Sequence, residues 1–389
     1  MRRFIVYRDS LFAPSESFIP RMYCNFAELH PIYLGAKFAI DPATSPKAHL
    51  VADHARTGWL GQAVYRQLGR TPGPLRQWLA QVAPVLIHAQ FGRGGALAMP
   101  LADALGLPLV VTFHGGDATK DKHFRGRGRF GTIFQRRRAH LVRRADLILC
   151  VSDFIRHRLI ERGFPPVKLR THYLGVEVPE RLDRWPDPGG RRLLFVGRFV
   201  EKKGLRDLIA AAARLGELGE NVELVLVGDG ELRAKIEAAA AGSGIRHRLT
   251  GWLPPEAVTR EMADAAVLVV PSRSAASGDA EGVPTVIFEA QSRGLPVVAT
   301  RHGGIPEAVR HRESGLLVDA GQPEAIAAAV RGLLGDHALY RTLQHGGRRS
   351  VETSFDAIRQ SSRLEQILLG VVTERRARCR SEHPLRAEP

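Results

Sequence analysis

Short apolar runs alternate with helical patterns along most of the chain. In the first half, four runs have the length and composition of buried strands: FIVYR, PVLIHAQF, PLVVTFH and DLILCVS. Strands that alternate with helices form parallel sheets through βαβ units. The pattern therefore predicts an α/β protein.

The same alternation restarts after a break near residue 185. The stretch RLDRWPDPGGRR is rich in Pro, Gly and charge, which is typical of a linker. After it come RLLFVGRF, LRDLIAAAARLGEL, VELVLVGDG, ELRAKIEAAAAGS, HRLTGW, AVLVVPS, IFEAQSRG and LPVVAT. We predict two tandem Rossmann-like domains facing across a cleft, over residues 1–180 and 193–355, joined by a linker over 181–192. In such sheets, ligands bind beyond the carboxyl ends of the strands.

Length and composition agree with this organisation. A chain of 389 residues exceeds the usual size of one domain, and 44% hydrophobic residues with 25% charged residues suffice for large cores. No run approaches the roughly 20 apolar residues of a spanning helix, and MRRFIVYRDS lacks the apolar region of a signal peptide. We expect a cytoplasmic protein.

The net charge of +16 is unevenly distributed. Residues 1–185 carry 28 Lys and Arg against 14 Asp and Glu, whereas the remainder is nearly balanced. In DKHFRGRGRFGTIFQRRRAHLVRRADLILC, basic residues alternate with Phe124, Phe130, Ile133, Phe134 and Leu141. This mixture suits an anionic membrane surface. Nucleic acid is the rival partner, but no nucleic-acid-binding motif supports it. A merely solvated arginine-rich face is the other alternative.

Neither a disulfide framework nor a metal site is expected. The cysteines Cys24, Cys150 and Cys379 are odd in number and far apart, so we expect reduced, structural thiols. There is no Asp-x-Asp, and HGGD at 114–117 offers too few ligands for a metal. The sequence therefore predicts neither a metal nor a cofactor.

The stretch EGVPTVIFE contains two carboxylates in an apolar segment. Pro284 disfavours helical geometry at the preceding residue and suits the first helical position, so we predict a helix that begins at Pro284. Glu281 then lies in the preceding loop and Glu289 about five residues into the helix. Free N–H groups at Gly282 and Val283 would form an anion site of the kind that seats a diphosphate. The carboxylates could accept sugar hydroxyls on either side.

A second motif, FVGRFVEKKG, supplies positive charge. Arg198 directly follows a strand, and Lys203 precedes a glycine that opens the next helix. Without a metal, a departing nucleoside diphosphate needs fixed cations and N–H dipoles. Each motif alone could merely cap or solvate a helix. Their order and spacing together favour a diphosphate site.

These motifs resemble the family-4 retaining glycosyltransferases of the GT-B fold (group 1 glycosyl transferases), of the exopolysaccharide type. The resemblance covers most of residues 190–365 through GRFVEKKG, LVGDGELRAKIE, LTGWLPPEAV, VLVVPS, EGVPTVIFEAQSRGLPVVAT, GGIPEAV and SGLLVDAG. The first half matches more loosely, through IHAQFG, VVTFHGGD, DLILCVSD and HYLGVEV.

The resemblance implies a role for each candidate residue. Glu281 would contact the donor hexose, Glu289 the ribose, and Arg198, Lys203, Gly282 and Val283 the diphosphate. His114 would lie by the reacting sugar; a strand-end histidine bonded to backbone is the alternative. The N-terminal domain would bind the acceptor and the C-terminal domain the nucleotide sugar. A helix over 356–372 would cross back to the first domain, ahead of a disordered basic tail over 373–389.

One segment departs from the family pattern. Many relatives carry a Gly-Gly loop after the first strand, where this chain has SLFAPSESFIPRM. Ser17 is a candidate for contacts to the acceptor. The alternative is that Ser15 and Ser17 cap the following helix, with Glu16 in its first turn.

The implied function is a retaining, metal-independent hexosyltransferase of bacterial surface polysaccharide synthesis. The donor would be a nucleotide sugar, with UDP favoured over GDP. The acceptor would be a lipid-linked saccharide at the inner face of the plasma membrane. A nucleotide-sugar epimerase, a nucleic-acid-binding protein and an inactive scaffold of a polysaccharide assembly complex are the alternatives. We expect Glu281→Ala to abolish transfer with little loss of folding.

Overall fold

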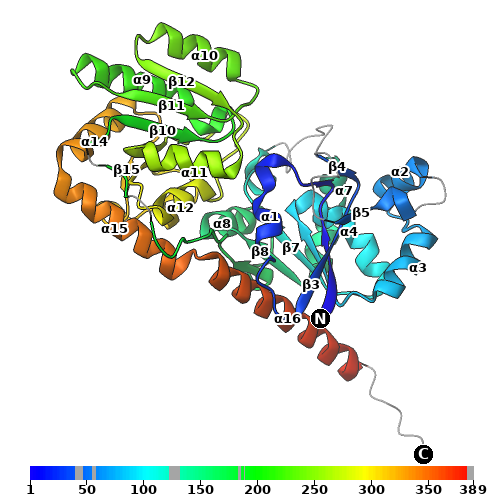
Figure 1. The fold of residues 1–389 in the computed structure, drawn as a ribbon. Coiled ribbons are helices and arrows are strands. Elements are labelled where there is room, and N and C mark those ends of the chain that lie inside the picture. Colours follow the sequence, from blue (N-terminus) through cyan, green and yellow to red (C-terminus); the bar gives the residue numbers. More distant parts are fainter. Residues whose placement is uncertain (40–46, 55–57, 122–131, 183–184, 188, 383–389) are drawn as a thin grey trace, which may run out of the picture. The chain divides into compact units, whose positions relative to one another are not determined.

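The computed structural model describes residues 1–39, 47–54, 58–121, 132–182, 185–187 and 189–382 (Figure 1). The chain divides into two compact units, each built around one parallel sheet. Unit 1 comprises Met1–Val151, Ile155–Tyr173 and Gln360–Pro389, and unit 2 comprises Ser152–Phe154 and Leu174–Arg359. The predicted α/β class with tandem Rossmann-like sheets is confirmed.

The sheet of unit 1 has seven strands, and the paired strands all run parallel. The chain first moves outward from β1 to one edge and then returns to β6 on the other side of β1. This reversal makes the β1/β6 pair the topological switch point of the sheet. In spatial order, the strands are β5 (Ala48–Leu50), β3 (Leu29–Gly35), β1 (Arg2–Tyr7), β6 (Ile87–Gln90), β7 (Leu109–Phe113), β8 (Leu147–Cys150) and β9 (Leu169–Thr171).

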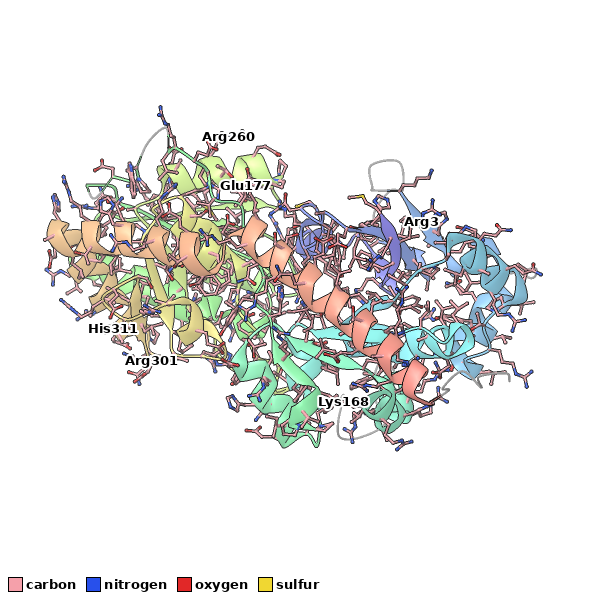
Figure 2. All side chains as sticks on the ribbon, turned by 90° about the horizontal axis from the view of Figure 1, so that it is seen from below. Arg3, Lys168, Glu177, Arg260, Arg301 and His311 are labelled. Carbon is pink, nitrogen blue, oxygen red and sulfur yellow. The ribbon has the colours of Figure 1, made fainter. Side chains whose placement is uncertain are left out.

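Helices connect these strands, and two short strands pair beside them. Lys168, labelled in Figure 2, donates from Nζ to the carbonyls of Val142, Arg143 and Ala145 at the C-terminal end of α7, where a cation is favourable. The elements are β2 (Ser10–Leu11), β4 (Lys37–Phe38), α1 (Phe18–Arg21), α2 (Trp59–Leu68), α3 (Gly73–Val82), α4 (Phe91–Leu105), α5 (Gly116–Thr119), α7 (Thr132–Arg144) and α8 (Asp153–Glu161).

The sheet of unit 2 has six strands in the order 3-2-1-4-5-6, the arrangement of a Rossmann fold, with its switch point between β10 and β13. The strands are β12 (Arg246–Gly251), β11 (Glu223–Val227), β10 (Arg192–Val196), β13 (Val267–Val270), β14 (Val297–Thr300) and β15 (Leu316–Val318). The helices are α9 (Leu205–Glu217), α10 (Arg233–Gly242), α11 (Pro255–Asp264), α12 (Thr285–Ser292), α13 (Ile305–Ala308), α14 (Pro323–Gly335) and α15 (His337–Ser354).

Two boundaries differ from the sequence prediction. Unit 2 takes up the chain at Leu174, not after residue 180, because Val176 exchanges backbone hydrogen bonds with Phe355 and Ala357. The last helix, α16 (Ala357–Glu382), continues ten residues beyond the predicted end at 372. The prediction of disorder is therefore wrong for residues 373–382, which are rich in helix-forming Arg and Glu and include an i,i+4 pair between Glu374 and Arg378. Residues 383–389 lie outside the described part.

None of the described helices combines the length and the apolar character that a bilayer-crossing segment requires. Of the cysteines, Cys24 is exposed and Cys150 is buried. The side chain of Cys379 lies outside the described part of the chain.

Candidate active site

At the switch point of unit 2, the loops that follow β10 and β13 come into contact. The first loop carries Arg198 and a 3₁₀ turn over Glu201–Lys203, and the second continues to α12. Gly204 permits the contact because its φ is +64° and a Cβ at this position would lie 1.9 Å from the carbonyl oxygen of Pro271. Only glycine combines that conformation with so close an approach.

Four charged side chains form a buried cluster near this contact. Lys203 Nζ lies 2.9 Å from Glu281 Oε1, and Lys202 Nζ lies 3.6 Å from Glu281 Oε2 and 3.2 Å from Asp279 Oδ1. Lys202, Asp279 and Glu281 each expose less than a tenth of their surface. Buried charges are tolerated only when they are paired and hydrogen-bonded. The mutual pairing of these side chains meets that requirement.

The cluster holds Glu281 as a carboxylate. Burial alone would raise its pKa, but the charges of Lys202 and Lys203 outweigh burial and lower the pKa from 4.5 to about 2. For Lys202, burial would lower the pKa, but Glu281 and Asp279 outweigh it, and the pKa lies above its ordinary value. At neutral pH the cluster is therefore charged but internally compensated.

Sequence reasoning identified two members of this cluster and missed two. It predicted Glu281 and Lys203 as separate ligand contacts, whereas the structure pairs them with each other. Lys202 and Asp279 were missed, although a Lys-Lys doublet and an aspartate two residues before Glu281 were available as signals. Lys202 and Asp279 are 77 positions apart, and the sequence does not show which residues of such distant loops face each other, so only the fold could join them.

Three predicted phosphate contacts lie in the same region. Arg198 is exposed, and its charge acts on Lys202. Gly282 and Val283 are buried, and within the described part of the chain their backbone N–H groups donate no hydrogen bond. An exposed cation and two unpaired N–H groups beside a charged cluster are the elements of an anion site.

The helix after this site begins one residue later than predicted. Pro284 is the N-cap of α12, with extended backbone (φ −68°, ψ 115°), and the helix starts at Thr285. Glu289 lies in the second turn and is half-buried, and its backbone carbonyl accepts from Arg293 Nη1 at 3.2 Å. The proline thus places Glu281 in the buried cluster and Glu289 on a helix.

A glycine pair in RHGGIP supports the loop that carries Glu281. Gly303 has φ +59°, and a Cβ there would lie 2.4 Å from the carbonyl oxygen of Glu281. A Cβ on Gly304 would lie 1.8 Å from the carbonyl oxygen of Gly282. The motif GGIPEAV marks these glycines in the sequence but gives no sign of this supporting role.

At the switch point of unit 1, polar groups likewise gather beyond the ends of strands. Gln90 ends β6 and His114 follows β7, and His114 Nε2 lies 2.7 Å from Gln90 Oε1. The alternative of a histidine ring bonded to backbone is not what the structure shows. Burial, followed by the charges of Arg8 and His88, lowers the pKa of His114 well below its ordinary value. The ring is therefore neutral at physiological pH.

The aspartate of HGGD has a structural role. Asp117 Oδ1 accepts from the backbone N–H groups of His114 at 3.0 Å and Gly115 at 2.9 Å, and Oδ2 accepts from Gly92 at 3.0 Å. These bonds fix the loop that carries His114. Among the described residues, no group of three or more His, Cys, Asp or Glu side chains is placed to hold a metal ion.

The segment containing Ser17 lies beside His114. Ser17 is exposed, has helical backbone angles and makes no side-chain cap, so the capping alternative for Ser17 is wrong. Glu16 instead accepts two hydrogen bonds from Arg8, at 2.8 and 2.7 Å. The Phe18 ring lies 5.0 Å from the ring of His114, which places this segment next to the candidate site of unit 1.

The apolar residues of the basic segment are not surface anchors. Ile133, Phe134 and Leu141 of α7 are buried in unit 1, because the apolar face of this amphipathic helix packs against the core. Phe124 and Phe130 lie outside the described residues. The prediction that these side chains reach a membrane is wrong for the three that can be examined.

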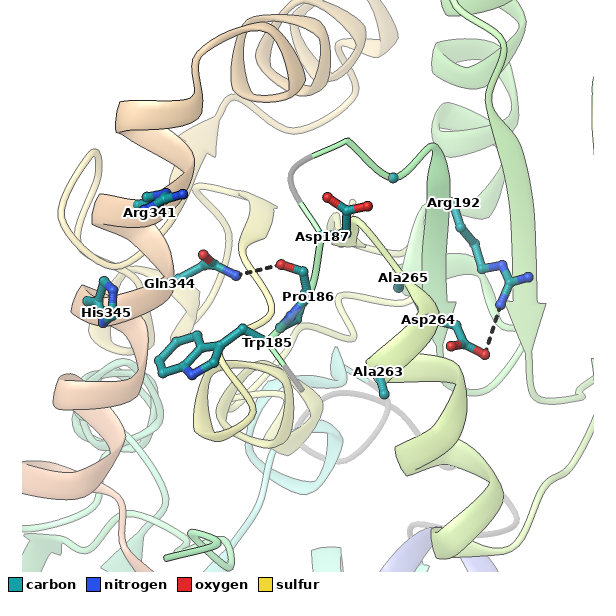
Figure 3. Close-up of a pocket in the computed structure, with 11 residues that line it drawn as sticks. Trp185, Pro186, Asp187, Arg192, Ala263, Asp264, Ala265, Arg341, Gln344 and His345 are labelled. Atoms are coloured by element: carbon teal, nitrogen blue, oxygen red, sulfur yellow. Dashed lines mark hydrogen bonds and ion pairs between the residues drawn. The ribbon is translucent and has the colours of Figure 1, made fainter. Parts of the chain in front are cut away.

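A separate cavity of about 930 Å³ lies in unit 2 (Figure 3). Its lining includes Arg192, the first residue of β10, so it lies at the amino ends of the strands, away from the charged cluster. Its polar groups are largely engaged with one another: Gln344 donates to the carbonyl of Pro186 at 2.9 Å, and Arg192 lies 3.5 Å from Asp264. Ligands of such sheets bind at the carboxyl ends, so this cavity is not the candidate active site.

The fold has close structural relatives. Anabaena HepE, solved in complex with UDP, matches with a TM-score of 0.75 at 18% identity, over 95% of this chain and 100% of that chain. Two parallel Rossmann-like sheets in tandem, each with polar groups at its switch point, define the GT-B class of fold.

The family follows from sequence comparisons. Residues 184–350 match the glycosyl transferases group 1, and residues 35–179 match the glycosyltransferase family 4. The amylovoran biosynthesis glycosyltransferase AmsK of Erwinia amylovora is 33% identical over 296 residues, 73% of this chain and 69% of that protein. A GDP-mannose-dependent phosphatidylinositol monomannoside mannosyltransferase of Mycolicibacterium smegmatis is 30% identical over 58% of this chain and 63% of its own length. The chain belongs to the group 1, family 4 glycosyltransferases.

Proposed function

We propose that this glycosyltransferase moves a hexose from a nucleoside diphosphate sugar to a saccharide hydroxyl, with retention at the anomeric carbon and without a metal ion. The observation that carries the proposal is the buried cluster of Lys202, Lys203 and Glu281 beside the unpaired N–H groups of Gly282 and Val283. Negative charge develops on the departing diphosphate, and preorganised cations and N–H dipoles stabilise it.

Each residue then has a defined task. Arg198 and Lys203 bind the diphosphate, and as Lys203 turns toward phosphate, the Glu281 carboxylate becomes free to accept a hydroxyl of the hexose. Glu289 accepts the ribose hydroxyls. The bond from the anomeric carbon to phosphate oxygen breaks as the acceptor oxygen attacks from the same face, and a phosphate oxygen takes the acceptor's proton. His114 is proposed to contact the reacting sugar.

The nucleotide base is proposed to be uracil. HepE was solved with UDP, but a family relative is named for GDP-mannose, so the two donors must be compared directly. Thermal shifts with UDP, GDP and ADP, each with and without EDTA, would make the comparison. A nucleotide at 100 times its Kd stabilises by about 2.7 kcal/mol, which is readily detected.

The expected result is a shift with UDP that EDTA leaves unchanged and Glu289→Ala removes. A shift lost with EDTA would refute metal independence, and the absence of any shift would favour an inactive scaffold. Transfer of labelled sugar only when an acceptor is added would exclude an epimerase. Substantial release of the epimeric nucleotide sugar without acceptor would contradict the proposal.

The acceptor is proposed to be a lipid-linked saccharide of surface polysaccharide synthesis. Support comes from relatives named for amylovoran biosynthesis and for a phosphatidylinositol mannoside. Unit 1 would bind it, with Ser17 close to the acceptor because its segment packs against His114. Ser17→Ala should then raise KM for the acceptor and leave nucleotide binding unchanged.

The enzyme would work at the cytoplasmic face of an anionic membrane. On α2, Leu60, Val64 and Leu68 expose 49%, 41% and 66% of their surface, and their spacing of four places them on one helix face. The basic helix α7 is tied to the end of α2, since Arg136 donates to Gln67 Oε1 at 3.1 Å. An apolar stripe beside clustered arginines suits an anionic lipid surface.

Flotation with vesicles containing anionic phospholipid, at low and high salt, would test this surface. Replacement of all three apolar residues of α2 by serine should abolish flotation, whereas Val167→Ser, at another position that is 92% exposed, should not. Salt-sensitive flotation is expected for the wild type. If the α2 variant and Val167→Ser float equally well, the apolar face of α2 is not the membrane contact. Binding to nucleic acid in preference to vesicles would favour nucleic acid as the partner of the basic surface.

A further inference from the structure

The chemistry at His114 depends on which ring nitrogen carries the proton. Nε2 lies 2.7 Å from Gln90 Oε1, whereas Nδ1 is buried and has no hydrogen-bond partner within the described part of the chain. The rings of Phe18 and Phe91 lie 5.0 and 4.5 Å from the imidazole ring. The imidazole therefore contacts two aromatic rings, with one nitrogen paired and the other without a partner among the described residues.

The backbone at Phe91 is itself unusual. Its φ is +65°, a left-handed conformation that bulky residues rarely adopt. The conformation occurs where β6 ends and α4 begins, next to Gln90. Strained backbone that persists in a folded protein marks positions where side-chain placement is constrained. Here the constrained side chain is one of the two that hold His114.

Behind Gln90, a buried chain of hydrogen bonds leads away from His114. Gln90 Nε2 donates to the hydroxyl of Tyr23 at 2.5 Å, and this hydroxyl lies 3.0 Å from His88 Nδ1. His88 Nε2 lies 2.7 Å from Thr112 Oγ1. Burial raises the pKa of Tyr23 well above its ordinary value, and burial with the charge of His172 lowers that of His88 to about 3. Tyr23 therefore keeps its proton, and His88 is neutral with a single N–H.

The hydrogen bonds behind Gln90 fix which atom donates and which accepts at each step. Tyr23 oxygen accepts from the Gln90 amide, so its own proton goes to His88 Nδ1. His88 must then carry its proton on Nε2, which points to Thr112 Oγ1 at 2.7 Å rather than to the Gln90 amide nitrogen at 3.5 Å. At the other end, the Gln90 carbonyl oxygen faces His114 and can only accept. The imidazole of His114 must therefore present an N–H at Nε2 and a bare lone pair at Nδ1.

We propose that this chain of hydrogen bonds, from Thr112 through His88, Tyr23 and Gln90 to His114, acts as a relay that makes Gln90 a positioning residue. Gln90 fixes the tautomer of His114. Nδ1 of His114 is then left to accept a hydrogen bond from a saccharide hydroxyl. The choice of ligand rests on the proposed function; the tautomer does not. The reverse direction would leave an unpaired N–H buried at Nδ1, and orphaned buried donors are rarer than under-satisfied acceptors. A sugar hydroxyl, which can donate, is the group that satisfies the lone pair.

Charged and titratable groups from the surrounding elements are compatible with a neutral His114. Arg8, after β1, is paired with Glu16, and its charge disfavours an imidazolium. His88 of β6 acts in the same direction. The carboxylate of Asp117, on α5, is engaged by backbone N–H groups. The relay therefore sets the tautomer of a ring that is already uncharged.

The tautomer can be measured without turnover. In the full-length protein labelled with ¹⁵N-histidine, comparison with His114→Asn identifies the His114 resonances by nuclear magnetic resonance. The wild type should show the Nε2–H tautomer. Gln90→Leu, which removes the acceptor, should yield a mixture of tautomers, and so should Tyr23→Phe, which frees the amide to rotate. Tyr33→Phe removes another hydroxyl of the same aromatic cluster and should change nothing.

Kinetics provide the second measurement. Gln90→Leu should lower kcat by roughly tenfold or more while KM for the nucleotide sugar changes little, because it perturbs orientation rather than binding. Gln90→Glu should raise the pKa of His114 and move the acidic limb of the pH–rate profile to higher pH. An Nδ1–H tautomer in the wild type, or an unchanged tautomer ratio in Gln90→Leu, would overturn the relay. The expected tautomers in a protein that transfers no sugar would support the relay and refute the proposed function.

Discussion

Replacement of Glu281 by glutamine removes one negative charge from the buried cluster at almost constant shape. Lys203 loses the carboxylate 2.9 Å away, and Lys202 retains Asp279 and the carbonyl oxygen of Ala280. The pKa of Glu281 falls from 4.5 in the reference state to about 2 in the folded protein. At about 1.4 kcal/mol per pKa unit, the charged form contributes roughly 3 kcal/mol at pH 7, in line with the cost of breaking a buried ion pair.

Urea unfolding of the full chain at several pH values would measure this cost. Because the folded pKa of Glu281 is depressed, its contribution is fully present above about pH 4.5 and is lost as the pH falls toward about 2. The difference in unfolding free energy between wild type and Glu281→Gln should thus be largest at pH 7 and fall to less than half at pH 3. The thermal midpoint at pH 7 should drop by roughly 6–12 °C.

A matched control tests whether burial is the cause. Glu217 pairs with Arg214 at 2.7 Å, but both side chains are about half exposed or more. Glu217→Gln should therefore cost less than about 1 kcal/mol at any pH. Equal costs for the two variants, or a cost at Glu281 that does not decline in acid, would refute the reasoning. The structure thus revises the expectation that Glu281 can be replaced with little loss of folding.

Three further changes follow from the contacts. Lys202→Met removes the buried cation that lies 3.2 Å from Asp279 and 3.6 Å from Glu281 and should lower the thermal midpoint by several degrees in scanning calorimetry, whereas an unchanged midpoint would show that the lysine is dispensable. Gly304→Ala places a Cβ 1.8 Å from the carbonyl oxygen of Gly282 and should weaken nucleotide binding at least tenfold by titration calorimetry. Undiminished affinity would show that the loop of Gly282 does not bind the nucleotide. Asp117→Asn replaces one carboxylate acceptor by an amide donor that faces backbone N–H donors and should cost about 1–3 kcal/mol in urea unfolding, with no cost expected if the loop is held by other groups.

The fold could be predicted because its signals are local. The run VELVLVGDG contains β11 (Glu223–Val227), and LRDLIAAAARLGEL contains α9 (Leu205–Glu217), because apolar periodicity reflects burial within each element. Errors arose where one pattern fits two environments. The spacing of the apolar residues of α7 fits both a helix at a membrane interface and a helix packed on a protein core. In the structure these residues are buried in the core. The end of α16 was misjudged because a charged segment can be a tail or a helix.

The candidate site was predicted only in part, since a motif identifies a loop but not the partner of each side chain. EGVPTVIFE and FVGRFVEKKG correctly marked two loops at one switch point. The motifs gave no indication that Glu281 pairs with Lys202 and Lys203. In unit 1, HGGD drew attention to His114 and IHAQFG contained His88 and Gln90, but neither motif showed that these residues connect through Tyr23.

By itself, the sequence determined the α/β class, the tandem sheets and the family, because these follow from periodicity and from the order of motifs along the chain. The tertiary structure decided which charges neutralise one another and which ring nitrogen of His114 is left without a partner. Tyr23 and His88 are 65 residues apart, and Lys202 and Asp279 are 77 apart. Such contacts exist only once parallel strands have brought their carboxyl ends together. The free energy of a buried charge or a directed hydrogen bond then depends on distance and burial, which the linear sequence does not contain.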